Sequence, residues 1–203
     1  MIKGISLDSG FALVAGILLW IVIRSFVLFK NKRYNRFSVQ REILINIFAV
    51  YVVLLISITL FPINIIWDEV IEKSPPAVNI IPFVDILTDF PRTQFSMAFK
   101  IEFLIKNLIG NLLLLLSIGI FLPTLWIKVR SFWKMLMIGA SASLTIEMLQ
   151  YVSAYLGYGW GRAADVDDLI LNTLGVIIGY RIFYKILIRL HVLSRSEMNI
   201  KAD

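Results

Sequence analysis

The chain has 203 residues, of which 59% are hydrophobic and 17% are charged, and its formal net charge is +6. A soluble domain carries fewer apolar and more charged residues, so one soluble core could not bury this many apolar side chains. The lack of cysteine excludes disulfides and thiolate metal sites. The basic residues lie in short blocks between apolar runs, which is typical of membrane orientation signals and not of nucleic-acid binding.

Five apolar runs follow one another along the chain, and each predicts a transmembrane helix. In lipid, only a helix satisfies every backbone hydrogen bond within one segment. The first run is too long for the hydrophobic core of a signal peptide, so we interpret it as a helix. Its Arg24 is expected to snorkel toward the basic block that follows. The runs are Phe11–Phe29, Ile43–Trp67, Asn107–Ile127, Met135–Tyr155 and a fifth from Asp168 to about Leu190.

The long connection between the second and third runs, Asp68 to Lys106, contains two apolar stretches that are too short to span a bilayer. These are Asn79–Leu87 and Phe95–Ile105, and we expect them to lie at the outer interface or to re-enter the outer leaflet. The predicted fold is therefore an all-α integral membrane protein. It is a bundle of about five transmembrane helices with an interfacial or re-entrant extracytoplasmic segment.

The distribution of charge between the runs predicts the orientation. The segments on one side of the membrane hold 13 basic and three acidic residues, whereas those on the other side hold six basic and ten acidic residues. The positive-inside rule then places the N-terminus outside and the C-terminus in the cytoplasm, in agreement with five spans. The expected domains are an N-terminal helix with a basic cytoplasmic loop (1–42), a membrane domain (43–190) and a cytoplasmic tail (191–203).

Polar residues gather where three of these helices reach the outer face. Glu147 lies about eight residues below the outer end of the fourth run, which at about 1.5 Å per residue places it inside the outer leaflet. The third run begins on this side with two asparagines four residues apart. The fifth begins there with an acidic stripe at i, i+3 and i+7 spacing. The predicted cluster comprises Asn107, Asn111, Glu147, Gln150, Arg162, Asp165, Asp168 and Asn172.

Polar groups within a bilayer are costly, which makes this cluster a candidate functional site. Purely structural interpretations stay open for each member. Asp165 and Asp168 have the spacing of a helix cap with an acid in the first turn, and the asparagines suit hydrogen bonding between helices. A carboxylate at this depth needs a proton or a partner, and Arg162 is the evident partner for Glu147. The G-x-x-x-G pattern at Gly175 predicts close helix packing.

The residue types limit the chemistry of the cluster. The single histidine, His191, lies at the cytoplasmic end, so no histidine base or histidine metal ligand is available outside. Carboxylate, amide and guanidinium groups remain. They suit binding of a polar head group, binding of a divalent cation, or acid–base catalysis by Glu147, Asp165 or Asp168. We expect no cofactor unless it is such a cation, and whether a reaction is catalysed stays open.

At these residues the chain resembles the VanZ-like family of bacterial membrane proteins, over roughly residues 45 to 185. The resemblance implies a protein of the bacterial cytoplasmic membrane that acts in the cell envelope. The family is named after a member that lowers susceptibility to the glycopeptide teicoplanin. The resemblance rests on Asn79–Phe83, Asn107–Pro123, Ser143–Gln150 and Gly161–Tyr180. The family positions that it carries over are Asn79, Asn111, Glu147, Gln150, Arg162, Asp165, Asp168, Asn172 and Gly175.

Three functions follow as hypotheses. In the first, the cluster engages an amphiphile, either a lipid-tailed glycopeptide or a lipid-linked wall precursor, and contributes to teicoplanin-type resistance. In the second, the protein is an enzyme that acts on a lipid-linked envelope substrate through Glu147. In the third, the cluster only holds helices together. The expected partners are membrane lipids and the amphiphile, without nucleic acid, and the oligomeric state stays open.

Overall fold

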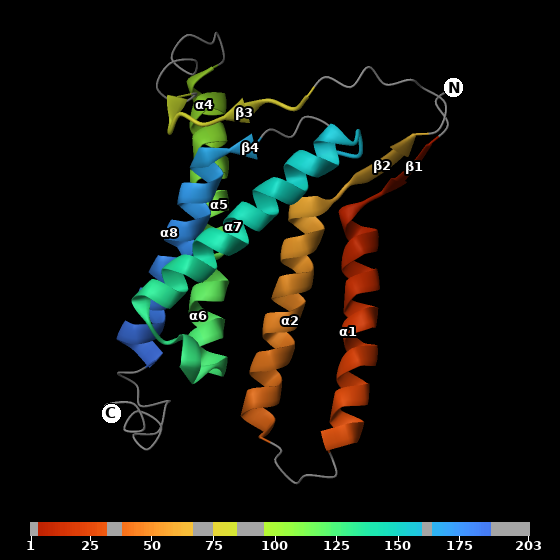
Figure 1. Ribbon diagram of the computed structural model, residues 1–203, viewed down its shortest axis with the longest axis vertical. Coiled ribbons are helices and arrows are strands. Elements are labelled where there is room, and N and C mark those ends of the chain that lie inside the picture. Colours follow the sequence, from red (N-terminus) through yellow and green to blue (C-terminus); the bar gives the residue numbers. More distant parts are fainter. Residues whose placement is uncertain (1–3, 32–37, 67–74, 85–95, 160–163, 188–203) are drawn as a thin grey trace. The chain divides into compact units, whose positions relative to one another are not determined.

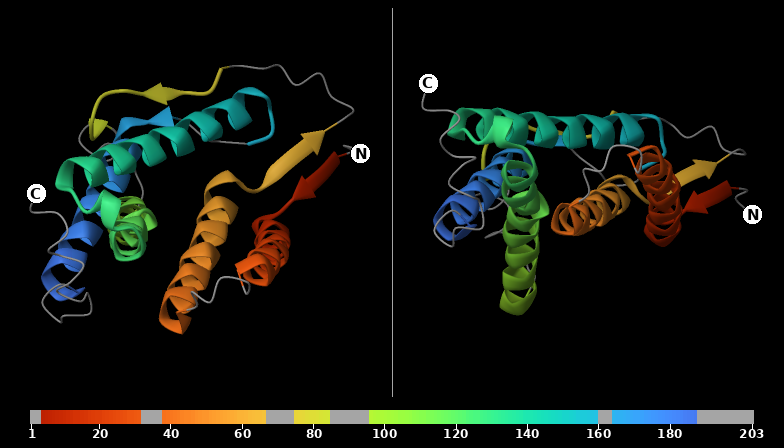
Figure 2. Two further views of the ribbon diagram at one scale, coloured as in Figure 1. Left: turned by 60° about the horizontal axis from the view of Figure 1, so that its bottom comes forward. Right: turned by 90° about the horizontal axis from the view of Figure 1, so that it is seen from below.

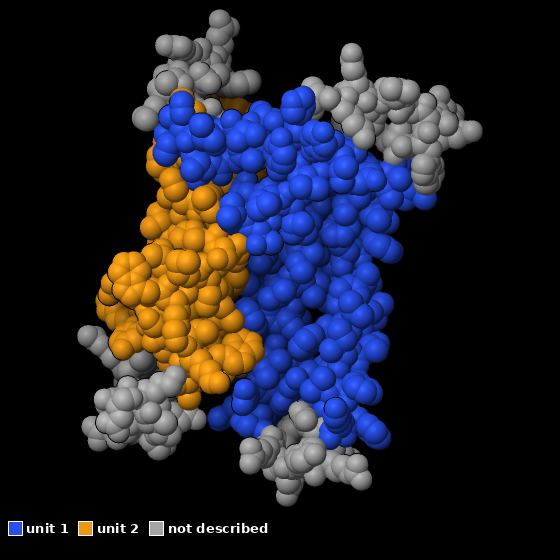
Figure 3. Space-filling model, viewed as in Figure 1, with its two compact units in different colours: residues 1–82, 144–166 blue, residues 83–143, 167–203 orange. Residues whose placement is uncertain are grey.

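The computed structural model describes residues 4–31, 38–66, 75–84, 96–159 and 164–187. The chain forms two compact units, which Figure 3 shows in different colours. Unit 1 comprises Met1–Pro82 and Leu144–Val166, and unit 2 comprises Phe83–Ser143 and Asp167–Asp203. Helix α7 (Phe132–Tyr155) contributes residues to both units, so each unit is described by itself below.

Two antiparallel helices, α1 (Ser9–Asn31) and α2 (Val39–Leu60), lie side by side in unit 1 (Figure 1). Close approach is possible at Gly16, where an added Cβ would press into the side chain of Val53. Leucine, isoleucine, valine and phenylalanine side chains cover much of the remaining surface of both helices. In a membrane, such side chains face lipid. The helix predicted from the first run is confirmed.

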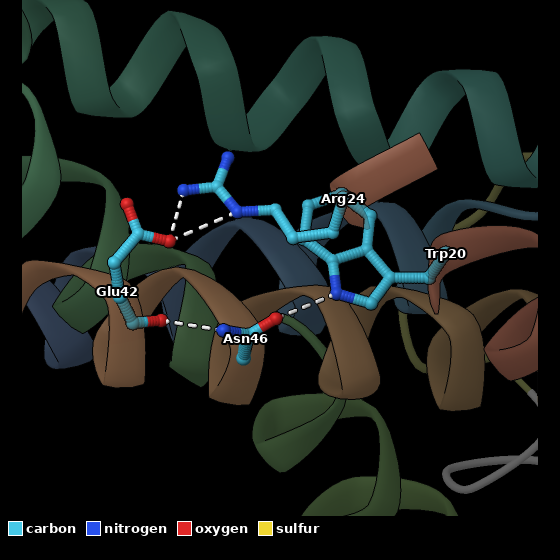
Figure 4. Close-up of polar contacts among 4 residues, drawn as sticks. All are labelled: Trp20, Arg24, Glu42 and Asn46. Carbon is cyan, nitrogen blue, oxygen red and sulfur yellow. Dashed lines mark hydrogen bonds and ion pairs between the residues drawn. The ribbon is translucent and has the colours of Figure 1, made fainter. Parts of the chain in front are cut away.

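A polar network joins α1 to α2, and Figure 4 shows its four side chains. Arg24 forms an ion pair with Glu42 of α2, and its Nε donates to the same carboxylate over 3.0 Å. Trp20 Nε1 donates to Asn46 Oδ1 over 2.9 Å, and Asn46 Nδ2 donates to the Glu42 carbonyl over 2.8 Å. Glu42 directly follows Arg41 of the basic block, so Arg24 reaches toward this block, as expected, and pairs there with a carboxylate.

Two short sheets lie in unit 1. Strand β1 (Gly4–Leu7) pairs antiparallel with β2 (Ile63–Ile66), and Figure 2 shows them leaving the ends of α1 and α2. Strand β3 (Val78–Asn79) pairs in parallel with β4 (Ala164–Asp165). The helix predicted over Ile43–Trp67 is therefore too long, because its last part forms strand β2. Helix α2 ends at Leu60 because Pro62 has no N–H to donate and the backbone before it is extended.

One long helical rod in unit 2 runs from Met97 to Leu125. It consists of α4 (Met97–Leu104), the π-helical turn η3 (Ile105–Ile109), α5 (Gly110–Leu114) and α6 (Leu116–Leu125). The start predicted at Asn107 is thus corrected to Met97, where Ser96 caps the helix by accepting from the Phe99 N–H over 3.3 Å. At about 1.5 Å per residue, the 29 residues extend about 43 Å. A hydrocarbon core of about 30 Å leaves several turns of this rod for the interface.

Helix α8 (Val166–Ile182) packs against this rod in unit 2, and the π-helical turn η5 (Phe183–Leu187) continues it. A Cβ added at Gly175 or Gly179 would collide with carbonyl oxygens of the rod, at Leu112 and Leu116 respectively. A Cβ at Gly119 of the rod would collide with the backbone of α8. The close packing predicted from the G-x-x-x-G pattern is confirmed, with a third glycine on the facing helix.

Four helices within the described residues are long and apolar enough to cross a membrane. The all-α membrane fold is therefore confirmed, with two small sheets added to it. Helix α8 has 17 residues and is not among the four, so the fifth span stays a prediction. The four helices are Ser9–Lys30, Val39–Leu60, Met97–Leu125 and Phe132–Tyr155.

Candidate functional site

Six of the nine predicted site residues fall into two sets, one in each unit. The first, called the Glu147 set, comprises Asn79, Glu147 and Asp165 of unit 1. The second, called the Asp168 set, comprises Asn111, Ser143, Asp168 and Asn172 of unit 2. The sequence predicted one cluster without Ser143, whereas the hydrogen bonds described here link the members within each set.

The Glu147 set is centred on a buried carboxylate. Glu147 of α7 is 6% exposed, and its Oε2 accepts a hydrogen bond of 3.1 Å from the backbone N–H of Asp165. The Asp165 carboxylate accepts from the Asn79 amide over 3.3 Å, and Asn79 Oδ1 accepts from the Ile81 N–H over 3.2 Å. Each of the two carboxylates therefore accepts a hydrogen bond from another residue of the set.

The pairing of β3 with β4 creates this arrangement. It places Val78 opposite Ala164 and Asn79 opposite Asp165, and the Ala164 N–H donates to the Ala77 carbonyl over 3.1 Å. Asn79 and Asp165 are 86 residues apart in the chain. The short β-bridge therefore brings the asparagine of the long connection to the acidic end of the segment before α8.

An apolar cavity of about 290 Å³ adjoins the Glu147 set within unit 1. Glu147 is the only ionisable carboxylate among its lining residues, and the rest of the wall is almost entirely carbon. The cavity combines a wall that suits a hydrocarbon group with one carboxylate at its edge. Its lining residues are Val78, Leu144, Glu147, Met148, Tyr151, Val152 and Ala164.

Gln150 ties α7 to α2 and does not line this cavity. Its Nε2 donates to the Thr59 carbonyl over 3.0 Å. Thr59 is in the last turn of α2, where carbonyl groups lack helical partners. The Asn64 N–H of β2 makes a related link by donating to the Tyr158 carbonyl over 2.9 Å. We infer that Gln150 positions α7 in unit 1 by capping a helix end.

The Asp168 set links three helical segments of unit 2. The Asn111 amide of α5 donates to the Asp168 carboxylate of α8. Ser143 Oγ of α7 donates to the Asp168 carbonyl over 3.4 Å and accepts from Asn172 Nδ2 over 3.1 Å. Asn172 is 1% exposed. Ser143 is buried as well, whereas Asn111 and Asp168 are half-buried. The network lies next to the glycine contact of α8 with the rod, as expected of amides that hold membrane helices together.

Asp167 is a buried acid that the sequence interpretation did not single out. It belongs to the first turn of α8, and its carboxylate accepts from the Phe83 N–H over 2.8 Å. Phe83 has a φ of 56°, a backbone conformation that non-glycine residues seldom adopt. The hydrogen bond compensates part of that strain. The only sign in the sequence that Asp167 has a role was its position beside Asp168. Its partner, the Phe83 N–H, is known only from the tertiary structure.

Two further predicted members belong to neither set. Asn107 is exposed within η3, and its side chain makes no hydrogen bond to the part of the chain that the structure describes. Arg162 lies outside the described residues, so its pairing with Glu147 stays a prediction. Among the described residues, no group of three or more His, Cys, Asp or Glu side chains has the arrangement of a metal site. The divalent cation therefore also stays a prediction.

A family model described as VanZ/LLP1 matches residues 48–189 of the chain. The match begins inside α2 and includes the rod, α7, α8 and both polar sets, whereas α1 precedes it. No curated protein and no solved structure matches the chain at a significant level. The resemblance inferred from the four sequence blocks is confirmed.

Proposed function

The chain belongs to the VanZ/LLP1 family, and we propose that it is an envelope protein that engages an amphiphile and contributes to teicoplanin-type glycopeptide resistance. The observation that carries this proposal is the apolar cavity beside buried Glu147. An amphiphile needs a hydrocarbon wall for its tail and a few polar groups that orient its head. The cavity and the Glu147 set supply both kinds of surface within one unit.

The size of the cavity limits what enters it. Ligand pockets commonly measure about 300–1,000 Å³, and this one lies at the lower end, at about 290 Å³. A whole glycopeptide is too large for it. We therefore propose that the cavity takes the lipid tail of an antibiotic or of a wall precursor, while the polar part stays near the Glu147 set and the membrane surface.

Drug susceptibility tests this proposal in a susceptible Gram-positive host that expresses the protein. We expect resistance to teicoplanin to rise more than resistance to vancomycin, which has no lipid tail. Ala164→Phe adds a ring to the cavity wall and should abolish the teicoplanin effect. The matched control is Val22→Phe, which adds the same ring to the exposed surface of α1. Full resistance in a folded Ala164→Phe protein would refute the cavity as the binding site.

We also propose an N-terminus outside the bacterial cytoplasmic membrane and a cytoplasmic C-terminus, because of the asymmetric distribution of basic residues. The cysteine-free chain allows a simple test. An impermeant thiol reagent applied to cells should label Ser9→Cys, and it should label Lys128→Cys only after permeabilisation. Labelling of Lys128→Cys in intact cells would contradict the proposed orientation.

A further inference from the structure

Unit 2 has a basic and aromatic surface at the end of its helices away from the Asp168 set. Arg181 follows Asp168 by 13 residues in α8, which is about 20 Å along the helix axis. We call this region the basic–aromatic surface. It comprises Lys128, Arg130, Lys134, Arg181 and Lys185 with the exposed rings of Phe132 and Tyr184, next to the buried rings of Tyr180 and Phe183.

Two guanidinium groups of this surface converge on one aromatic cluster. The Cζ of Arg130 lies 5.5 Å from the ring centroid of Phe183, and that of Arg181 lies 5.8 Å from the ring centroid of Phe132. Tyr180 stacks on Phe183 with a centroid separation of 6.2 Å and lies within electrostatic range of both arginines. Arg130 is fixed further, since its Nε donates to the Pro123 carbonyl over 2.7 Å.

The charge around these arginines has one sign. Residues 126–146 and 169–187 contain no aspartate or glutamate. The side chains of Lys128, Lys134, Arg181 and Lys185 are exposed. Such a concentration of positive charge on adjacent segments attracts an anion of high charge density.

The aromatic residues indicate the depth of this surface in the bilayer. Trp126, Trp133 and Tyr184 are exposed at the same end of the unit 2 helices. Exposed Trp and Tyr side chains concentrate at the level of the lipid head groups. The anion available at that level on the cytoplasmic side is the phosphodiester of an anionic phospholipid.

We propose that the basic–aromatic surface binds the head group of an anionic phospholipid. The planar guanidinium groups of Arg130 and Arg181 are suited to paired hydrogen bonds with phosphate oxygens, and the exposed lysines add attraction at longer range. A zwitterionic lipid lacks the net negative charge that this surface selects. This proposal does not depend on the amphiphile cavity, but it rests on the membrane orientation proposed above.

Lipid binding to the purified full-length protein tests the proposal. The probe is phosphatidylglycerol, with phosphatidylcholine and free inorganic phosphate as comparisons, and the readouts are the melting temperature and the lipid retained in native mass spectrometry. We expect phosphatidylglycerol to be retained and to raise the melting temperature. Phosphatidylcholine and inorganic phosphate should do neither. Equal stabilisation by phosphatidylcholine would overturn the proposal.

Charge-matched variants locate the site. Arg181→Gln/Lys185→Gln should weaken phosphatidylglycerol binding by more than tenfold, because each cation at a membrane surface contributes about fivefold. Lys100→Gln/Lys106→Gln removes the same charge from the opposite end of the rod and should leave binding unchanged. If the first variant does not fold, Lys128→Gln/Lys134→Gln alters exposed side chains of the same surface. If both double variants lose phosphatidylglycerol binding equally, the effect depends only on net charge, and the proposed site is refuted.

Discussion

The Glu147 set and the Asp168 set use the same kinds of side chain in different surroundings. The Glu147 set is tied to backbone donors of the chain and adjoins an apolar cavity. The Asp168 set joins three helical segments next to the glycine contact of α8 with the rod, and two of its four members are buried. A polar network beside a cavity has room for a ligand, whereas one inside a tight helix contact has a packing role. The two sets therefore differ in role because of their surroundings and not because of their residue types.

The largest effect is expected at the glycine contact of unit 2. Gly175→Ala places a methyl group against the Leu112 carbonyl, and a helix backbone cannot shift as a flexible side chain would. We expect a loss of about 3 kcal/mol or more, at the upper end of overpacking effects. Thermal unfolding in detergent measures it. Gly110→Ala is the matched control in the same rod, because its Cβ meets nothing within 4 Å. Equal stability of the two variants would show that the contact is loose.

The next effect concerns the α1–α2 network of Figure 4. Glu42→Ala leaves Arg24 without its carboxylate, and the two side chains are only 19% and 15% exposed. We expect a loss of about 1–3 kcal/mol, below the 3–5 kcal/mol of a fully buried pair. Arg24→Leu/Glu42→Leu should restore most of it. The control Glu102→Ala removes an exposed acid and should change stability by less than about 0.5 kcal/mol.

A smaller effect is expected within the Asp168 set. Asp168→Ala and Asn111→Ala should be coupled, because each change leaves the partner without its hydrogen bond. Couplings between membrane helices average about 0.6 kcal/mol and reach about 1.7 kcal/mol. A double-mutant cycle on unfolding in detergent measures this one. If the effects of the two changes on stability simply add, the hydrogen bond between Asn111 and Asp168 does not stabilise the helix contact. The packing role of the Asp168 set would then be contradicted.

The smallest effect on stability is expected at Glu147, together with a large effect on function. Glu147→Gln keeps an oxygen that accepts from the Asp165 N–H, so stability should change by less than about 1 kcal/mol. Teicoplanin resistance should be lost because the carboxyl group at the cavity is gone. Melting temperature and inhibitory concentration of the same variant decide the matter. A folded Glu147→Gln protein with full resistance would remove Glu147 from the proposed site.

Several features of the fold were predictable because they depend on short stretches of sequence. In lipid no water is available to hydrogen-bond with the backbone, so an apolar run must be helical. This reasoning predicted α1, α2, α7 and most of the rod. The G-x-x-x-G pattern predicted where helices touch, because only glycine removes the side chain between two backbones. Helix ends were less predictable. The polar residues near Lys106 suggested a helix start, but the rod continues through them; a helix of 29 residues is longer than a hydrocarbon core requires, so its first turns can carry polar side chains.

The sequence by itself determined the membrane character of the chain, its family and which polar residues interrupt its apolar segments. The tertiary structure decided how those residues are divided. Asn79 reaches Asp165 only through the β3–β4 bridge, which closes 86 residues of chain and has no local signature. Ser143 joins the Asp168 set, and Arg24 finds Glu42, because neighbouring helices present these groups to one another. Periodicity assigns a residue to a face of its own helix, but its partner depends on which helix packs there.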